Sequence, residues 1–98
     1  MVKPEEIIKD ELYNFSGNID MTEKFTDDTF VNTLFDEDKG IDIFVCDDVT
    51  ARFGVPINKN MCYIGRYYDG YVYVLNYDKS FGKYYHKISA DLFDKVYK

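Results

Sequence analysis

The chain has 98 residues, with 18 acids against 12 lysines and arginines, which gives a net charge of −6 at pH 7. A chain of this length has room for one hydrophobic core, so we expect residues 1–98 to form a single compact domain. The acidic balance argues against a protein that coats duplex nucleic acid through bulk positive charge.

The first predicted element is a helix over residues 4–15. Pro4 suits the first position of a helix, and the acids Glu5 and Glu6 complement the positive end of its dipole. Ser16 and Gly17 then end the pattern. The apolar residues of this stretch fall on one helical face: Ile7, Ile8, Leu12 and Phe15.

A second helix is predicted over residues 27–35. We expect Thr26 to cap it and Phe25 to pack against Phe30 as a hydrophobic staple. Its expected buried side consists of Phe30, Val31, Leu34 and Phe35. Acids at 36–38 follow at the carboxyl end, where the helix dipole disfavours negative charge. Helix stability therefore does not explain why these acids are there.

The next segments predict strands. Residues 41–46 have strand character, whereas 49–60 reads as a loop with one helical turn at 49–53. Residues 61–68 and 71–77 are apolar and aromatic, and Asp69-Gly70 between them is typical of a two-residue type I′ turn. This pattern predicts a hairpin over residues 61–77.

The two-residue turn also fixes the register of the hairpin, because facing residues must have numbers that sum to 139. One side then carries the pairs Tyr68 with Tyr71, Arg66 with Tyr73, Ile64 with Leu75 and Cys62 with Tyr77. The other side carries Val72 and Val74, whose shape suits packing under a helix. We expect the valine side to face the core.

The last elements are a strand and a short helix. Residues 83–88 alternate, with His86 and Ile88 on one side. Ser89 is expected to cap a short C-terminal helix with the apolar residues Leu92, Phe93 and Val96. The predicted fold is α+β, with two N-terminal helices, a three- to four-stranded mostly antiparallel sheet and a short C-terminal helix.

The charge is divided unevenly along the chain. Residues 1–49 hold fourteen acids and four lysines, a net charge of −10, whereas residues 50–98 hold four acids and eight basic residues, a net charge of +4. Nine of the ten tyrosines lie in the second half. Because both halves share one core, we expect an acidic face and a Tyr/Lys face on one domain.

The acids of the central segment admit three interpretations. They are Asp36, Glu37, Asp38, Asp42, Asp47 and Asp48. An EF-hand loop starting at Asp36 would place Ile41 where glycine is needed and Asp47 where glutamate is needed, so a calcium or magnesium site is not favoured. A solvated face is the simplest interpretation. An acidic docking surface for a basic protein is the third.

The tyrosine side of the hairpin, with Arg66, Tyr68, Tyr71 and Tyr73, also has more than one interpretation. Aromatic and cationic side chains of this kind stack on the bases of single-stranded nucleic acid. Half-buried sheet residues or protein interface anchors are the favoured interpretation, because tyrosine is a good strand former and Tyr and Arg are common interface residues. The surplus of aromatic residues further suggests a homodimer through the hairpin.

The sequence offers little catalytic chemistry. Cys46, Cys62 and His86 are too few for a structural zinc site, and both cysteines lie in strand-like stretches as small buried hydrophobes. His86 is flanked by lysines and tyrosines, which favours a structural residue over a general base. No nucleotide-binding or nucleophile motif occurs. We expect a protein that is not an enzyme and has no cofactor or metal.

The leading hypothesis is a small acidic interaction protein. It would bind and inhibit a basic nuclease or other nucleic-acid-binding protein, as an anti-defence protein of a phage or mobile element does. One alternative is a domain that binds single-stranded nucleic acid through its Tyr/Lys face. Another is an immunity protein or antitoxin against a basic nuclease, which would use the same acidic surface.

The compartment follows from the start of the chain and from its hydropathy. Two acids stand where a signal peptide needs uncharged apolar residues, and no apolar run approaches the ~20 residues of a membrane-spanning helix. We therefore expect a cytoplasmic protein, in the host cytoplasm if it is viral, with no membrane partner.

Overall fold

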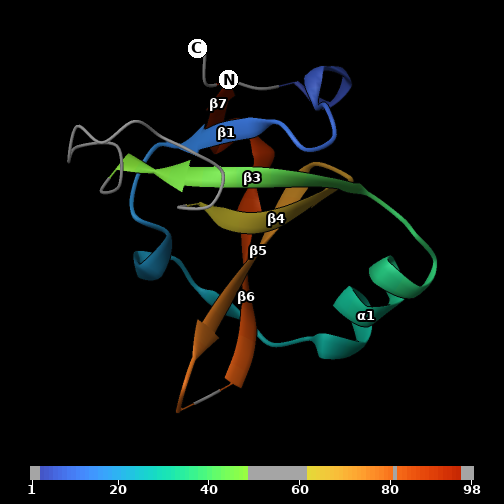
Figure 1. The fold of residues 1–98 in the computed structure, drawn as a ribbon, viewed down its shortest axis with the longest axis vertical. Helices are drawn as coiled ribbons and strands as arrows, with labels where there is room; N and C mark the ends of the chain where they lie inside the picture. Colours follow the sequence, from blue (N-terminus) through green and yellow to red (C-terminus); the bar gives the residue numbers. More distant parts are fainter. Residues whose placement is uncertain (1–2, 49–61, 81, 96–98) are drawn as a thin grey trace.

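The protein is built on one mixed β-sheet in a computed structural model that describes residues 3–48, 62–80 and 82–95. The strand order is β2-β6-β5-β4-β3-β1-β7, with β1 parallel to β3 and all other neighbours antiparallel (Figure 1). In chain order the elements are η1 (Pro4–Glu6), β1 (Leu12–Phe15), η2 (Ile19–Met21), β2 (Lys24–Phe25), α1 (Asp28–Asp36), β3 (Ile41–Asp47), β4 (Tyr63–Tyr68), β5 (Tyr71–Asp78), β6 (Gly82–Ser89), η4 (Ala90–Leu92) and β7 (Phe93–Lys95).

The predicted fold class is wrong in its balance of helix and sheet. The described residues form seven strands and one α-helix, with short 3₁₀ turns where the other two helices were expected. Both errors lie near the ends of the chain, in segments that become strands because distant strands pair with them.

The first error is the helix over residues 4–15. Only Pro4–Glu6 is helical, and Asp10 has φ 63°, a left-handed conformation that a continuing right-handed helix does not contain. Leu12–Phe15 instead pairs in parallel with β3, from Leu12 opposite Phe44 onwards. This pairing buries the Tyr13 side chain completely.

The second error is the C-terminal helix. Residues 90–92 make a single 3₁₀ turn, and the Ser89 side chain makes no capping hydrogen bond to it. β7 then pairs with β1, which places Phe93 opposite Phe15 with their ring centroids 5.4 Å apart. Burial of the Phe93 ring against β1 favours the strand over a continued helix.

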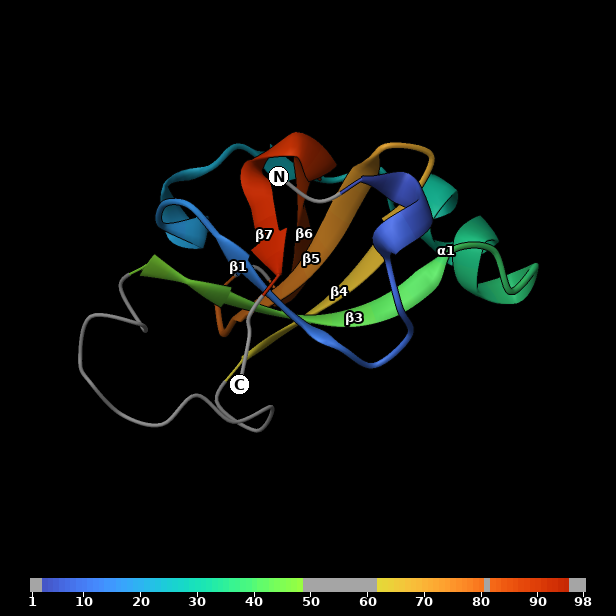
Figure 2. The ribbon, with the colours of Figure 1, turned by 90° about the horizontal axis from the view of Figure 1, so that it is seen from above.

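The sheet curls strongly, and the connection between β6 and β7 shows why. These strands are five positions apart in the sheet, which would be roughly 24 Å if the sheet were flat. The chain between Ser89 and Phe93 reaches at most about 14 Å. The sheet therefore bends toward closure, as the view in Figure 2 shows.

The curled sheet has a hydrophobic core on each face. The inner core contains side chains from eight elements and one connecting segment: Ile7, Tyr13, Phe15, Ile19, Ile43, Val45, Tyr67, Val72, Val74, Ile88, Ala90 and Phe93. The outer core is smaller and consists of Val31, Leu34 and Tyr73, packed with Phe25, Phe30, Tyr68 and Tyr85. α1 thus covers one part of the outer face.

The second predicted helix is confirmed as α1, within one residue at each end. Its N-cap is Asp27, whose side chain accepts a hydrogen bond from the Phe30 amide at 3.0 Å, and not Thr26. Phe25 and Phe30 make the expected staple as an edge-to-face pair. Phe35 was placed on the buried side and is instead 46% exposed.

The hairpin and its register are confirmed. β4 and β5 pair with Tyr68 opposite Tyr71 and Ile64 opposite Leu75, and both Asp69 and Gly70 have the positive φ of a type I′ turn. Val72 and Val74 are fully buried in the inner core, as expected. The helix, however, packs on the opposite side of the hairpin, against Tyr73.

The structure also tests the other two predicted strands. β3 and β6 confirm the strands at 41–46 and 83–88, with His86 and Ile88 on the buried side. The helical turn expected at 49–53 lies outside the described residues. In the part of the chain that the structure covers, no helix has the length and apolar character needed to cross a bilayer.

Gly40 provides a test of the fold where α1 leads into β3. Its φ is +89°, and a Cβ there would lie 2.5 Å from the Tyr67 carbonyl oxygen and 3.0 Å from Cγ of Arg66. We expect Gly40→Ala to lower the free energy of unfolding by at least about 2 kcal/mol in urea denaturation.

Gly70→Ala is the matched control for this prediction. Gly70 has a similar φ of +87°, but no heavy atom lies within 4 Å of the added Cβ. Gly70→Ala should lower the free energy of unfolding by only about 1 kcal/mol, the energy that an L-residue loses in a left-handed backbone conformation. Equal losses in the two variants would show that the Tyr67 carbonyl does not restrict position 40.

Candidate functional site: an acidic end beside an apolar strip

Acidic residues gather at the end of the sheet where β1 and β3 begin and β4 ends. The Asp10 amide donates to the Asp42 carbonyl at 2.8 Å, which places the start of β1 beside the start of β3. Tyr67 pairs with Ile41, so the turn after β4 lies at the same end. We call this region the acidic end; its acids are Asp10, Glu11, Asp36, Glu37, Asp38, Asp42 and Asp69.

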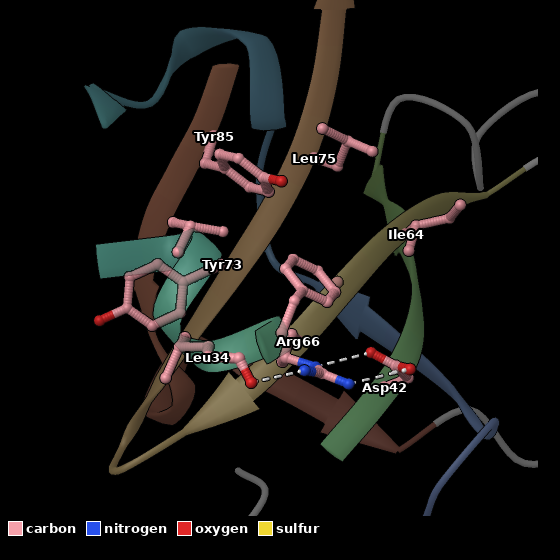
Figure 3. A pocket seen from close by; sticks show the side chains of 10 residues that line it. Leu34, Asp42, Ile64, Arg66, Tyr73, Leu75 and Tyr85 are labelled. Carbon is pink, nitrogen blue, oxygen red and sulfur yellow. Dashed lines mark hydrogen bonds and ion pairs between the residues drawn. The ribbon is translucent and has the colours of Figure 1, made fainter. Parts of the chain in front are cut away.

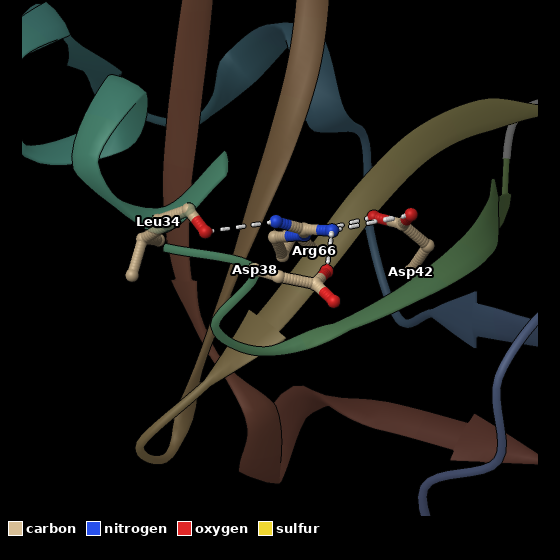
Figure 4. A network of polar contacts seen from close by, with 4 residues as sticks. All are labelled: Leu34, Asp38, Asp42 and Arg66. Atoms are coloured by element: carbon tan, nitrogen blue, oxygen red, sulfur yellow. Dashed lines mark hydrogen bonds and ion pairs between the residues drawn. The ribbon is translucent and has the colours of Figure 1, made fainter. Parts of the chain in front are cut away.

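Arg66 organises the acidic end from within (Figure 4). Its side chain is 10% exposed, and its guanidinium donates to Asp42 through Nε at 2.9 Å and Nη2 at 3.3 Å. Nη1 donates to the Leu34 carbonyl at 3.1 Å, and the ring of Phe35 lies 4.3 Å from the guanidinium carbon. Arg66 therefore joins the carboxyl end of α1 to β3 and is not an exposed partner contact.

The three acids at positions 36–38 remain accessible. All three are exposed, and the last turn of α1 contains no basic residue. The Asp38 side chain is 96% exposed and only approaches Arg66, at 3.8 Å. Glu37 pairs with Lys39 at 2.9 Å, but both side chains are about half exposed, so water screens this pair. These carboxylates are available to a partner, as are those of the exposed residues Asp10, Glu11 and Asp69.

The structure separates the last two predicted acids from the others. β3 runs from Ile41 to Asp47, so Asp47 and Asp48 lie about 20 Å from the acidic end. Asp47 is buried, and its carboxylate accepts a hydrogen bond from the Ile19 amide at 3.3 Å. Asp48 is half-buried and accepts from Asn14 Nδ2. The six acids therefore do not form one patch.

The predicted aromatic residues are also divided. Tyr73 is buried under α1, and burial raises the pKa of its hydroxyl. Tyr68 is half-buried against Phe30. Tyr71 is exposed, and Nζ of Lys87 lies 4.4 Å from the centre of its ring. Since α1 covers Tyr68 and Tyr73 within the same chain, the aromatic surplus no longer calls for a second copy.

The residues that sequence reasoning missed form an apolar strip beside the acidic end. Ile64, Leu75 and Tyr85 face one another across β4, β5 and β6, and Phe35 lies at the end of α1 beside them. Figure 3 shows Ile64 and Leu75 on the same side of the sheet as the Arg66 and Asp42 pair. Phe35 and Ile64 are 46% and 54% exposed. The hairpin register predicted from the sequence already paired Ile64 with Leu75, and this apolar pair was the sequence feature that could have revealed the strip.

The hollows at this site are shallow. The one between α1 and the strip has a volume of about 20 Å³, enough for roughly one water molecule. A second, of about 200 Å³, lies at the acidic end between Lys9, Asp38, Gly40, Asp42 and Arg66. Both are smaller than the sites that hold cofactors or substrates. Across the described residues, no three His, Cys, Asp or Glu side chains gather as metal ligands.

His86 is held inside the protein. Nδ1 lies 2.7 Å from Oγ1 of Thr22, which itself donates to the Ile19 carbonyl, so Nδ1 carries the proton in this contact. Nε2 lies 3.5 Å from Asn76 Nδ2. Burial lowers the pKa of the imidazole, with hydrogen bonds opposing the shift. These contacts make His86 a packed structural residue.

The role of Arg66 can be tested by substitution. Arg66→Met would leave the Asp42 carboxylate without its guanidinium donors and the Leu34 carbonyl with the Lys39 amide as its remaining donor. We expect the free energy of unfolding to fall by about 2–3 kcal/mol. Arg66→Lys should lower the free energy of unfolding by most of the same amount. One ammonium cannot reach both acceptors with the geometry of the guanidinium.

Chemical denaturation of the two variants measures these losses. Asp42→Asn is the matched control, since the amide oxygen of the asparagine still accepts from Arg66. This variant should lower the free energy of unfolding by about 1 kcal/mol. Full stability of Arg66→Lys would contradict the bridging role of the guanidinium.

Comparisons with known proteins do not assign this chain to a family. No family model, no curated protein and no solved structure matches it.

Proposed function

We propose that the protein is an interaction module that binds a basic surface of another protein through the acidic end and the apolar strip. The observation that carries the proposal is the juxtaposition of exposed carboxylates at 36–38 with the exposed side chains of Phe35 and Ile64. Protein interfaces commonly combine an apolar centre with a charged rim. The same strip with no partner would leave apolar surface in water without a role.

The charge of the acidic end favours a basic partner. Its seven acids are accompanied by three basic residues, Lys9, Lys39 and Arg66, so its net charge is −4. Arg66 already pairs with Asp42 within the protein, whereas Asp36 and Asp38 are exposed at the end of α1. A cluster of this sign accelerates and orients association with a positive surface.

The partner class follows from where such positive surfaces occur. Proteins that handle nucleic acids carry Lys/Arg patches that bind phosphates, and an acidic protein placed on such a patch competes with the nucleic acid. The proposed activity is therefore inhibition of a nuclease or other nucleic-acid-binding protein in the cytoplasm. An anti-defence inhibitor of a phage or mobile element and an immunity protein against a toxic nuclease would both work in this way.

Charge reversal at the acidic end tests the proposal. A variant with Asp36→Lys, Glu37→Lys and Asp38→Lys should fold normally, because these side chains are exposed. Affinity capture from the native host followed by mass spectrometry identifies the partner of the wild-type protein. Binding of that partner should weaken at least about a hundredfold in the variant, which corresponds to about 2.7 kcal/mol over the three charges.

The control variant carries Glu23→Lys, Asp91→Lys and Asp94→Lys. These acids are also exposed but lie elsewhere on the chain, and both triple variants have the same net charge of zero. Binding that survives in the control and is lost in the first variant assigns the contact to the acidic end. Equal binding by both variants would refute the proposal.

A second candidate function is contact with single-stranded nucleic acid. Nζ of Lys24 lies 4.5 Å from the centre of the Tyr84 ring, and Lys83 lines the same hollow of about 360 Å³. A cation and an aromatic ring at one place can hold a phosphate and stack on a base. Asp28 also lines this hollow and opposes an anionic ligand.

A salt-titrated mobility shift with short oligonucleotides tests this candidate. Retention that weakens as salt rises, and that is lost in a variant with Lys24→Ala and Lys83→Ala, would support it. The acidic-end variant should bind at least as well as wild type in this assay. No retention at low salt would rule the candidate out.

A further inference from the structure

Cys46 and Cys62 occupy the position next to the last residue pair of β3 and β4. β3 and β4 are antiparallel, with Phe44 opposite Ile64 and Val45 opposite Tyr63. One further step in the same register brings Cys46, in β3, opposite Cys62, the residue before β4. Neither cysteine is part of a disulfide in this structure.

The hydrogen-bond pattern determines how closely this pair approaches. The Phe44 amide donates to the Glu11 carbonyl and the Asp42 carbonyl accepts from Asp10, so the even-numbered residues of β3 direct their backbone groups to β1. The odd-numbered residues therefore bond to β4, and continuing this alternation by one step makes Cys46 and Cys62 a position of the non-hydrogen-bonded kind. The Cα atoms of such pairs are about 4.5 Å apart, within the range that disulfides span.

A pair of the same kind on these strands shows how closely side chains approach at such positions. Asp42 and Arg66 are also an even-numbered, non-hydrogen-bonded pair, and their side chains are in contact at 2.9 Å. Because side chains alternate between the faces of a sheet, Cys46 and Cys62 lie on this same outer face. Burial is the main reason that the pKa of the Cys46 thiol is raised, and the smaller electrostatic contribution of Cys62 to that shift agrees with this proximity.

We propose that Cys46 and Cys62 form a dithiol site that a low-molecular-weight disulfide, such as oxidised glutathione, converts into a cross-strand disulfide. The Cys62 thiolate attacks one sulfur of glutathione disulfide, forming a mixed disulfide and releasing one glutathione thiolate. Cys46 then attacks the Cys62 sulfur, which forms the Cys46–Cys62 bond and expels the second glutathione. The two cysteines are oxidised by two electrons, and the two protons leave with two reduced glutathione molecules.

Burial sets the order and the speed of these steps. Cys46 is almost fully buried and its Sγ donates to the Asp47 carbonyl at 3.3 Å, whereas Cys62 is half-buried, so Cys62 reacts first. Burial raises the pKa of the Cys46 thiol to about 11 and that of Cys62 above its usual value. Thiolate is therefore scarce at neutral pH, and below these pKa values the rate should rise about tenfold per pH unit.

The bond would close a ring of chain from residue 46 to residue 62. It would join the end of β3 to the start of β4 in the register that the strands already have. A covalent link restricts the unfolded chain more than the folded one, so it stabilises the protein. In a reducing cytoplasm the site would stay as two thiols, and oxidising conditions would convert it.

The experiment treats the full-length protein with oxidised glutathione at pH 8.5 and maps its tryptic peptides without reduction. Cleavage after Lys39, Arg52, Lys59 and Arg66 separates the two cysteines, so the disulfide would link peptides 40–52 and 60–66. We expect this linked pair from monomeric protein and a melting temperature higher by on the order of 10 °C. Reduction should reverse both changes.

Cys46→Ala is the matched control. In this variant Cys62 should stop at the mixed disulfide with glutathione, and the melting temperature should not rise with oxidation. Wild-type protein that stops at the same mixed disulfide, keeps both thiols or forms only disulfide-linked dimers would overturn the proposal. The peptide map of the wild type decides the question even if the variant does not fold.

Discussion

The guanidinium of Arg66 is the contact on which the acidic end of the protein depends. It is buried between α1 and the sheet, where it donates to the last turn of the helix at Leu34 and to Asp42 on β3. A planar group with several donors can serve both acceptors at once, which an ammonium cannot do. By binding Asp42 internally, Arg66 also determines which acids stay available: those at the end of α1, and not the one on the strand.

The closure of the sheet explains the distribution of aromatic residues. Because β6 and β7 are joined by a single 3₁₀ turn, the sheet must curl, and its inner face accepts the valines of β5 together with Tyr13 and Phe93. The tyrosines on the other side of the hairpin lie outside this core, and α1 packs over them at Tyr73. One sheet thus uses both faces, and the exposed side chains of Phe35 and Ile64 lie beside the end of α1.

How far the sequence alone predicts this fold depends on the range of the interactions involved. The hairpin turn, the Phe25 and Phe30 staple and the alternation before Ser89 are local patterns, and each is confirmed. The strands at 12–15 and 93–95 are three or four residues long, and only pairing with each other and with β3 makes them strands. No local pattern contains that information, so helical periodicity was the wrong guide there.

The site was predictable to a similar extent. The exposed acids after α1 followed from their unfavourable place at the helix end, whereas the burial of Asp47 and the pairing of Asp42 with Arg66 required the register of β3 against β4. That register also decides the position of Cys46 against Cys62. It spans a segment without a turn signal, so sequence reasoning had no means to fix it.

The position of β1 has a consequence for how the chain assembles. Tyr13 pairs with Val45 on one side and with Lys95 on the other, whereas β4, β5 and β6 are consecutive neighbours. Closing long loops is slow, so the three-stranded meander can form early while β1 waits for both of its distant neighbours. The strand nearest the amino terminus is therefore the one whose docking completes the fold.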